Sequence, residues 1–234
     1  MKICDIHSHV LFGVDDGAQT LDQSLEMLKN AVAGDVQTLV ATPHFFGGQT
    51  GEIRAAFRQM KDAAADIPVE LLLGAEVRVT ENLPALLRQK TVPAINGGRY
   101  LLTEFPLDTP GTEFLTVLKD ILACGYVPLV AHPERYRAVA DAPCIVENWL
   151  DIGCHLQLTG GSIRGDYGKT AQKTAWQLLR GDYVACIASD AHNGGSRSNF
   201  LMDIYDHLAV HYAPSYARCL LYTNPMAICH DQTI

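Results

Sequence analysis

The chain has 234 residues, of which 48% are hydrophobic and 19% charged, and it carries a formal net charge of -8. This length and composition predict a single globular domain over residues 1–234 with a substantial core, and they exclude a disordered chain. The negative charge argues against binding to nucleic acid or to an anionic membrane surface, because both require a basic face.

The sequence also gives expectations about cellular location. No apolar run approaches the roughly 18 residues needed to span a bilayer. Polar Asp5 and His7 follow Met1 so closely that no apolar region of a signal peptide fits between them. The seven cysteines are scattered without a Cys-x-x-Cys pair, so neither a disulfide framework nor a zinc ribbon is indicated. We therefore expect a cytoplasmic protein without membrane insertion.

Short apolar strands alternate with helical segments along the whole chain. Strands are predicted over residues 3–10, 38–44, 69–76, 100–106, 127–133, 155–159 and 183–190. Helices are predicted over residues 21–34, 53–60, 83–88, 112–125, 145–152 and 170–179, with two closing helices at 200–210 and 215–221. Thr20 with Gln23 forms a capping box, Thr112 is a predicted N-cap, and the glycine-rich segment 160–165 is a predicted loop.

This alternation predicts the fold class. Nearly continuous apolar strands separated by helices are typical of parallel strands that are buried on both faces. We predict an α/β fold, a distorted TIM-like (β/α)7 barrel with parallel strands and outer helices, with an open doubly wound sheet as the alternative. In both architectures ligands bind at the carboxyl ends of the strands.

Ionisable residues gather at those predicted strand ends. His7 and His9 are two residues apart on the first strand, so their side chains share a face. The complete set of candidate metal ligands is His7, His9, Asp16, His44, Glu76, Glu104, His132, Asp190 and His192. Because this set holds five of the nine histidines of the chain, we interpret it as a metal site rather than a chance distribution.

The ligand types restrict the metal. Imidazole and carboxylate groups without thiolates suit Mn(II), Fe(II) or Zn(II). Nine ligands exceed the roughly four to six positions around one ion, so we expect two or three ions with a shared carboxylate. Glu76 lies nearly opposite the first strand in a closed barrel and is the candidate bridge.

The segments around these residues resemble the polymerase-and-histidinol-phosphatase (PHP) superfamily. The matching segments are DIHSH at 5–9, VDDG at 14–17, TPH at 42–44, GAE at 74–76, EFP at 104–106, AHPERY at 131–136 and ASDAHN at 188–193. Within the superfamily the chain is similar to the manganese-dependent tyrosine phosphatases of bacterial capsule and exopolysaccharide loci, the CpsB/CapC type. The resemblance implies a PHP fold and a metal-dependent protein-tyrosine phosphatase.

The resemblance also implies how three Mn2+ ions are held, with Fe2+ or Zn2+ as substitutes. The first ion would take His7, His9, Glu76 and Asp190, the second Glu76, Glu104 and His132, and the third Asp16, His44 and His192. Glu104 occupies a position where other PHP proteins have histidine. This difference favours the tyrosine-phosphatase branch over the histidinol-phosphatase branch.

Three arginines are candidates for binding the substrate phosphate. Arg135 follows His132 closely, and its guanidinium could donate to two phosphate oxygens at once. Arg197 follows the last metal-binding segment, although the chain continues with Ser198 and Asn199 where similar proteins often have two prolines. Arg164, in the predicted glycine-rich loop, is the third candidate.

The implied substrate is a phosphotyrosine protein, the tyrosine-rich tail of a bacterial tyrosine autokinase that controls polysaccharide synthesis. A tyrosinate leaving group, with a conjugate-acid pKa of about 10, needs less general-acid assistance than an alkoxide. Two alternatives stay open: a PHP phosphatase for a small molecule such as histidinol phosphate, and a non-catalytic metal-binding regulatory module. Arg54 and Arg58, spaced for one helix face, leave a homo-oligomer open as well.

Overall fold

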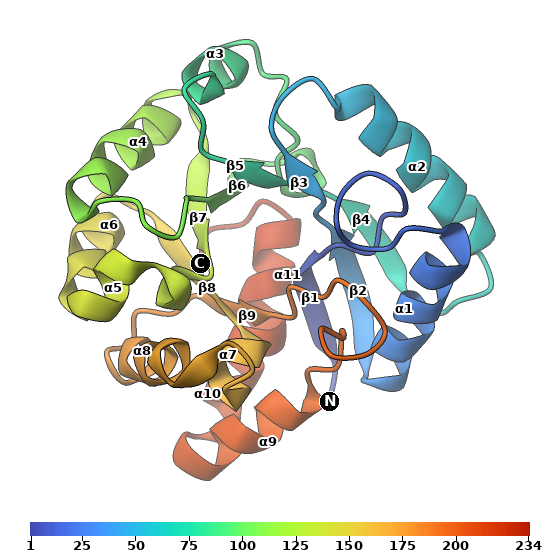
Figure 1. The fold of residues 1–234 in the computed structure, drawn as a ribbon. Helices are drawn as coiled ribbons and strands as arrows, with labels where there is room; N and C mark the ends of the chain where they lie inside the picture. The colour runs from blue at the N-terminus through green and yellow to red at the C-terminus, as the bar shows by residue number, and fades with distance from the viewer.

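Parallel strands form the centre of the molecule and helices cover them on the outside (Figure 1). The structure is a computed structural model that describes residues 1–234. Its strands are β1 (Ile3–Ser8), β2 (Val36–Ala41), β3 (His44–Phe45), β4 (Glu70–Leu73), β5 (Glu76–Arg78), β6 (Tyr100–Glu104), β7 (Val127–Ala131), β8 (His155–Thr159) and β9 (Cys186–Ala188). The predicted α/β class with parallel strands and outer helices is confirmed.

The strands belong to two sheets that meet beside β1. One sheet has the order β1-β2-β4, and the other has the order β3-β5-β6-β7-β8-β9. A parallel bridge between Ser8 and Ala191 links the carboxyl end of β1 to the segment after β9. The backbone N–H of Asp190 donates to the carbonyl of His7 at 2.8 Å, and that of His9 donates to Ala191 at 2.7 Å. The first and last strands therefore lie next to each other.

Two of the seven predicted strands are each broken into two segments. The predicted strand 38–44 divides into β2 and β3, and the predicted strand 69–76 divides into β4 and β5. Pro43, which has no N–H to donate, lies at the first break, and Gly74 lies at the second. The expectation that His44 and Glu76 end their strands was therefore wrong: each begins a short strand, and the two are paired in register.

The helices surround the strands on all sides (Figure 1). They are α1 (Leu21–Ala33), α2 (Thr50–Ala63), α3 (Leu83–Arg88), α4 (Gly111–Ala123), α5 (Arg137–Asp141), α6 (Glu147–Asp151), α7 (Gly160–Arg164), α8 (Gly168–Arg180), α9 (Met202–His211), α10 (Pro214–Arg218) and α11 (Asn224–Cys229). Shorter turns are η1 (Ile95–Gly97), η2 (Pro133–Arg135), η3 (Pro143–Val146) and the π-turn η4 (Cys219–Thr223). None of these helices is both long and apolar enough to cross a membrane.

The predicted helix starts were partly right. The capping box is confirmed, because Thr20 Oγ1 accepts from the N–H of Gln23 and the Gln23 side chain accepts from the N–H of Thr20, both at 3.3 Å. The N-cap at Thr112 was wrong. Helix α4 begins at Gly111, and its N-cap position is Pro110, which lies two residues before Thr112 and makes no side-chain capping bond.

The glycine-rich segment after β8 is also not the predicted loop, because it forms helix α7. Helix α9 packs against this helix, and a Cβ added at Gly160 would lie only 2.9 Å from Leu201 Cδ2. Glycine at this position therefore permits close packing. The helix ends at Gly165, whose φ of 100° lies in the left-handed region.

Two hydrophobic cores hold these layers together. A cluster of 48 buried residues fills the space between strands and helices. A second cluster of 12 buried residues includes Cys4 and Ile6 of β1, Leu129 of β7 and Cys186 of β9. Ile228 and Cys229 of α11 belong to this inner cluster, so the C-terminal helix packs against the amino-terminal part of the strands. The opposite, carboxyl ends of the strands carry the polar residues.

Candidate metal centre

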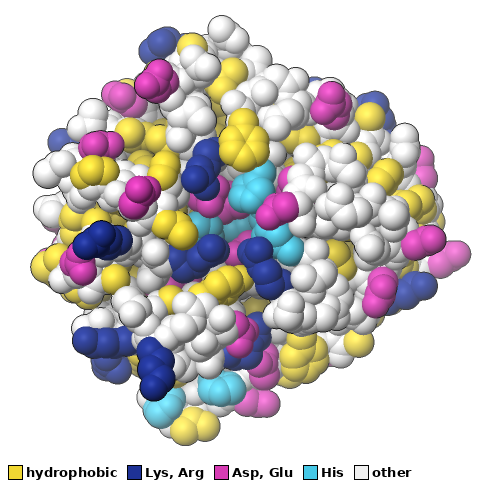
Figure 2. Space-filling model, viewed as in Figure 1, with side chains coloured by type: hydrophobic (Ala, Val, Ile, Leu, Met, Phe, Trp, Pro, Cys, Tyr) yellow, Lys and Arg dark blue, Asp and Glu magenta, His cyan; other side chains and the backbone are white.

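All nine predicted ligands lie around the carboxyl ends of the strands. They are His7 on β1, His9 and Asp16 after it, His44 at the start of β3, Glu76 at the start of β5, Glu104 at the end of β6, His132 after β7, and Asp190 and His192 after β9. Figure 2 shows histidine side chains inside a hollow at the centre of this face, with acidic and basic side chains around them. The structure thus brings the predicted set together.

His7 and His9 both direct their Nε2 atom toward the same point. The amide nitrogen of Gln157 donates to the carbonyl of Leu158, which fixes the orientation of the amide. Its oxygen Oε1 therefore faces His7 and accepts from Nδ1 at 2.7 Å. The Nδ1 of His9 likewise faces the carboxylate of Asp15 at 2.8 Å. When the imidazoles of His7 and His9 are neutral, the Nε2 atom of each therefore carries a lone pair. These two atoms are only 3.3 Å apart, so they converge as ligands of one cation would.

The carboxylate of Glu76 lies between several of the histidines. Its Oε2 is 3.4 Å from His7 Nε2 and 3.3 Å from His9 Nε2, and its Oε1 is 2.8 Å from His132 Nε2. Burial opposes ionisation of this side chain, but the surrounding histidines hold the pKa of Glu76 well below its usual range. Several imidazoles therefore share one carboxylate whose ionised form they favour.

The carboxylates around His7 and His9 favour the protonated forms of these imidazoles in the metal-free protein. Burial opposes protonation of His9, but its hydrogen bonds to Asp15 and two other carboxylates raise the pKa of His9 well above the usual value. The pKa of His7 is also raised, because Glu76 and Asp190 outweigh the effect of burial. A metal ion would displace these protons, as is usual for histidine sites.

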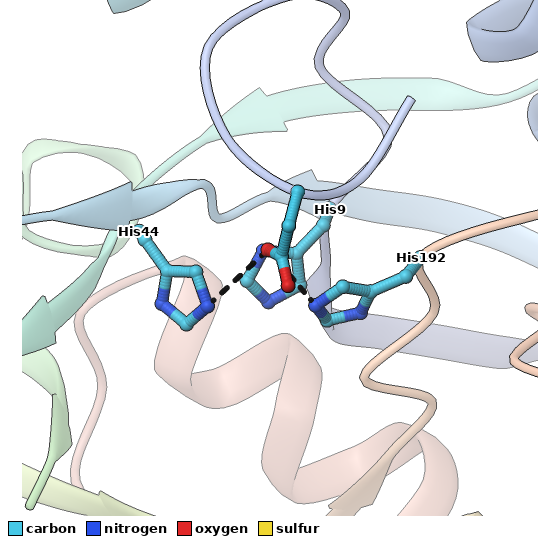
Figure 3. Close-up of side chains that lie close together, drawn as sticks. His9, His44 and His192 are labelled. Carbon is cyan, nitrogen blue, oxygen red and sulfur yellow. Dashed lines mark ion pairs between the residues drawn. The ribbon is translucent and has the colours of Figure 1, made fainter. Parts of the chain in front are cut away.

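A further group surrounds the exposed carboxylate of Asp16. It consists of His9, Asp16, His44 and His192. Asp16 Oδ1 lies 3.5 Å from His44 Nε2 and 3.4 Å from His192 Nε2, and Figure 3 marks both ion pairs. Burial, together with the nearby charge of His9, lowers the pKa of His192 to about 4, so this imidazole is neutral at pH 7 and available to a cation.

The residues present fit metal ions. The buried Nδ1 of His44 and Oε2 of Glu104 make no hydrogen bond, although Glu76 lies 3.0 Å from the first atom and Arg78 lies 2.7 Å from the second. The potential ligand atoms of His7, His9 and Glu76 lie within 4.8 Å of one another, and those of His44, Glu76 and Glu104 form a second such group. Buried lone pairs that converge without hydrogen bonds are typical of sites built for cations.

The groups of candidate ligands that lie close together match the three expected ligand sets only in part. The expected first set lies together, with Asp190 Oδ1 at 3.5 Å from His7 Nε2. In the second set His132 contacts Glu76, whereas its Nε2 is 3.8 Å from Glu104 Oε1. His9 joins the third set, and His44 also faces Glu76 and Glu104. Which residues hold which ion stays a prediction.

Two residues that orient the histidines were missed by the sequence analysis. Asp15 accepts from His9, and it also accepts from the backbone N–H of His44 at 3.0 Å. Its position beside Asp16 in the VDDG segment was a possible signal. Gln157, in the middle of β8, accepts from His7. No local pattern distinguishes this glutamine, because its role depends on a residue 150 positions earlier.

The predicted phosphate-binding arginines border the centre. Arg135 Nη1 lies 3.1 Å from Asp190 Oδ2, and Arg197 Nη2 lies 2.9 Å from the same oxygen. The guanidinium carbons lie 4.6 Å and 5.8 Å from the ring centroid of Tyr167, which therefore holds both side chains in place. Tyr167 was also missed by the sequence analysis.

A third arginine lies at the centre, but it is not the predicted one. Arg164 pairs with Asp166 at 2.8 Å and with Asp203 at 3.2 Å rather than with a predicted ligand, and its role at the phosphate stays a prediction. Arg78, at the end of β5, instead lies 2.7 Å from Glu104. It is two residues from Glu76 on the same strand, and this alternation was the available signal.

Comparisons with known proteins agree with this geometry. Residues 3–230 match the family described as "Capsular polysaccharide synthesis, CpsB/CapC". The chain is 34% identical to the tyrosine-protein phosphatase CpsB of Streptococcus pneumoniae, over 98% of this chain and 99% of that protein. It superposes with a TM-score of 0.92 and 30% identity on a solved structure from a study of YwqE from Bacillus subtilis and CpsB from Streptococcus pneumoniae, described as "unique metal-dependent tyrosine phosphatases", covering 99% of this chain and 96% of that one.

A more distant likeness concerns the fold alone. A phosphotriesterase homology protein from Escherichia coli superposes with a TM-score of 0.66 and 12% identity, over 96% of this chain and 97% of that one. Together with the first structural match, it confirms the predicted TIM-like architecture. The family match extends over nearly the whole chain, and the relative from Streptococcus pneumoniae aligns almost end to end. The chain therefore belongs to the CpsB/CapC family.

Proposed function

We propose that this chain is a metal-dependent phosphatase that hydrolyses phosphotyrosine on a protein and so regulates capsular or exopolysaccharide synthesis. The observation that carries the proposal is the group of converging histidine nitrogens and carboxylates with two arginines at its border. The names of the relatives, which are tyrosine-protein phosphatases, support the substrate class. We also propose that residues 1–234 form one PHP domain.

The proposed cofactor is Mn2+, in two or three ions. The ligands would be the nine residues predicted from the sequence, with Glu76 shared between ions. Bound metal ions of this kind lower the pKa of water and so supply a nucleophile near neutral pH. The role of the protein is to hold the imidazoles in one orientation, which Gln157 and Asp15 do by accepting from His7 and His9.

Arg135 and Arg197 would bind the phosphate. Both contact Asp190 through one terminal nitrogen, and each guanidinium has further N–H groups that can donate to phosphate oxygens. Stacking against Tyr167 limits their movement and keeps both charges on the same side of the centre. Charge that develops on the phosphoryl oxygens during transfer would be stabilised there.

The surroundings favour a protein substrate over a small molecule. A cleft of about 540 Å³ adjoins Arg135 and is lined also by Leu107, Arg137 and Tyr167. On another side Phe46 is 52% exposed, and its ring centroid lies 5.9 Å from that of His44. An aromatic side chain at the border and an open cleft suit a tyrosyl ring with chain on both sides of it.

The proposed partner is a bacterial tyrosine autokinase with a tyrosine-rich tail. A cytoplasmic location belongs to the same proposal, because an autokinase needs ATP to phosphorylate that tail. Histidinol phosphate stays the alternative substrate. Its alkyl phosphate would require more general-acid assistance than an aryl phosphate does, and no observation at the centre favours it.

The test compares hydrolysis of a phosphotyrosine peptide with that of histidinol phosphate. Both reactions are measured with Mn(II) and then with chelator, for the unmodified protein, His7→Ala and Arg135→Ala, with the exposed Arg180→Ala as control. We expect preferential cleavage of the peptide, loss of activity with chelator or His7→Ala, and a raised KM for Arg135→Ala. Preference for histidinol phosphate would reject the substrate class. Absence of hydrolysis would favour a regulatory module.

A further inference from the structure

A second cavity lies away from the metal centre, near the amino ends of the strands. It has a volume of about 610 Å³, opens to solvent, and is lined by helix α2, strand β4, residues 90–99 and residues 124–126. Arg99 comes directly before β6, and Gly125 lies shortly before β7, so the cavity lies toward the opposite ends of these strands from Glu104 and His132. None of its lining residues belongs to the metal centre.

The cavity exists because the strands leave a gap here. Strand β4 is the last strand of its sheet, and β5 pairs with β6 only near the carboxyl end, at Thr103 and Glu104. The turn η1 lies at this gap and lines the cavity, and its Ile95 is completely buried in the inner core. The side chain of Asn96 donates to the carbonyl of Cys229 at 3.0 Å and ties the turn to α11. The turn that lines the cavity is therefore held in place before any ligand binds.

The charge of the lining is unusual for this chain. Acidic residues outnumber basic ones by 26 to 18 in the whole sequence. The cavity is nevertheless lined by four basic side chains and no acidic one; the basic residues are Arg54, Lys61, Lys90 and Arg99. Arg99 is paired with Asp231 at 3.1 Å, whereas the other three make no ion pair. Three cations around one hollow raise its potential and attract anions.

The remaining lining is apolar and partly aromatic. Leu71 and Val92 are buried, and Phe57, Leu73 and Tyr126 are half-buried at the cavity. The Nζ of Lys61 lies 5.9 Å from the centroid of the Phe57 ring, so a cation and an aromatic surface stand side by side. A ligand that fits this combination carries several negative charges at one end and a flat apolar group at the other.

We propose that this basic pocket binds a small soluble ligand in which a sugar joins a diphosphate to a flat aromatic base, the chemistry of a nucleoside diphosphate. The diphosphate would pair with Arg54, Lys61 and Lys90, and the ring would lie against the apolar wall beside Phe57. The volume lies within the range of about 300–1,000 Å³ that is usual for small-molecule sites. This proposal does not depend on the phosphatase activity.

The test is calorimetric titration of the Mn(II)-loaded protein, with excess inorganic phosphate present to occupy the metal centre. ADP is compared with pyrophosphate, which lacks the ring, and with adenosine, which lacks the phosphates. We expect ADP to bind more tightly than pyrophosphate and adenosine not to bind measurably. The double variant Lys61→Glu/Lys90→Glu should weaken ADP binding by roughly tenfold or more, because two attractions become repulsions.

The matched control is Lys29→Glu/Lys173→Glu, which makes the same change in net charge at two exposed lysines outside the pocket. This control should change ADP binding by less than about twofold, since distant surface charges are screened. Both double variants should hydrolyse phosphotyrosine peptide at the rate of the unmodified protein, which also shows that they are folded. No binding of ADP, or an equal loss in both double variants, would overturn the proposal, whatever the outcome for the phosphatase activity.

Discussion

Gln157 is expected to control metal affinity although it is not itself a predicted ligand. It is completely buried, and its Oε1 accepts from His7 Nδ1 at 2.7 Å. Its own amide nitrogen donates to the carbonyl of Leu158 at 2.7 Å, which fixes the orientation of the amide. The proton of a neutral His7 is therefore held on Nδ1, and Nε2 remains available to a cation.

The substitution Gln157→Met keeps the side chain close to its original volume and removes the acceptor. The buried Nδ1–H of His7 would lose its partner, which destabilises the folded protein by about 1–3 kcal/mol. For a chain of this length each kcal/mol lowers Tm by about 2–4 °C. The imidazole would also lose its fixed tautomer, and losses of this kind reduce metal affinity by about 10- to 100-fold.

The assay is a Mn(II) titration followed by phosphotyrosine-peptide hydrolysis, together with the Tm of the metal-free protein. At saturating Mn(II) the KM for the peptide should remain unchanged, because Gln157 does not face the substrate. Gln172→Met is the control: this side chain donates to the carbonyls of Ile163 and Arg164 at 3.1 and 3.0 Å and contacts no predicted ligand. It should lower Tm without changing metal affinity. Equal Mn(II) affinities for the two variants would refute the reasoning.

Four further outcomes follow from the same geometry. Chelation should abolish hydrolysis and lower Tm, and added Mn(II) should restore both; activity that survives complete chelation, verified by metal analysis, would contradict the metal chemistry. Arg135→Lys should raise the KM for the peptide by roughly tenfold, because a single ammonium replaces a forked guanidinium; an unchanged KM would remove Arg135 from the phosphate site. Phe46→Ala should raise the KM for a phosphotyrosine peptide about three- to tenfold while leaving Mn(II) affinity unchanged, since an aromatic pair contributes about 0.5–1.5 kcal/mol; a loss of metal affinity instead would mean that the ring supports His44. Mn(II) affinity should rise with pH, because the raised pKa of His9 favours its proton in the metal-free fold. That protonation stabilises the metal-free protein fully below the unfolded pKa of 6.5, and the stabilisation is lost as pH rises through the folded pKa. Calorimetry in buffers of different ionisation enthalpy should show proton release on metal binding, and its absence would contradict this assignment.

The parts of the structure that the sequence predicted are those with a local cause. Alternating apolar strands and amphipathic helices identified the fold class, since burial on both faces of a parallel strand leaves a continuous apolar run. The clustering of the candidate ligands followed from the same pattern, because residues such as His132 and Asp190 come directly after such runs. The capping box at Thr20 and Gln23 was found for the same reason, as its two partners are three residues apart.

Features that depend on distant parts of the chain were missed. The division of two predicted strands depends on where each half finds a partner: β2 and β4 pair in one sheet, and β3 and β5 pair in the other. The role of Gln157 depends on His7, and that of Tyr167 depends on two arginines that are far apart in sequence. Segment 160–165 was assigned as a loop from its glycines, whereas close packing against Leu201 favours a helix with small residues.

The backbone at two predicted ligands shows why folding and metal binding should be coupled. His132 has φ of 35° and Asp190 has φ of 53°, both in the left-handed region, which costs on the order of 1–3 kcal/mol for such residues. The N–H of Arg135 donates to the carbonyl of His132, and the N–H of Asp190 donates to His7, so hydrogen bonds hold both conformations. A metal present at 100 times its Kd adds about 2.7 kcal/mol of stability, comparable to one of these strained positions. Substitutions that weaken only metal binding should therefore also lower thermal stability when Mn(II) is scarce, and excess Mn(II) should reverse that loss.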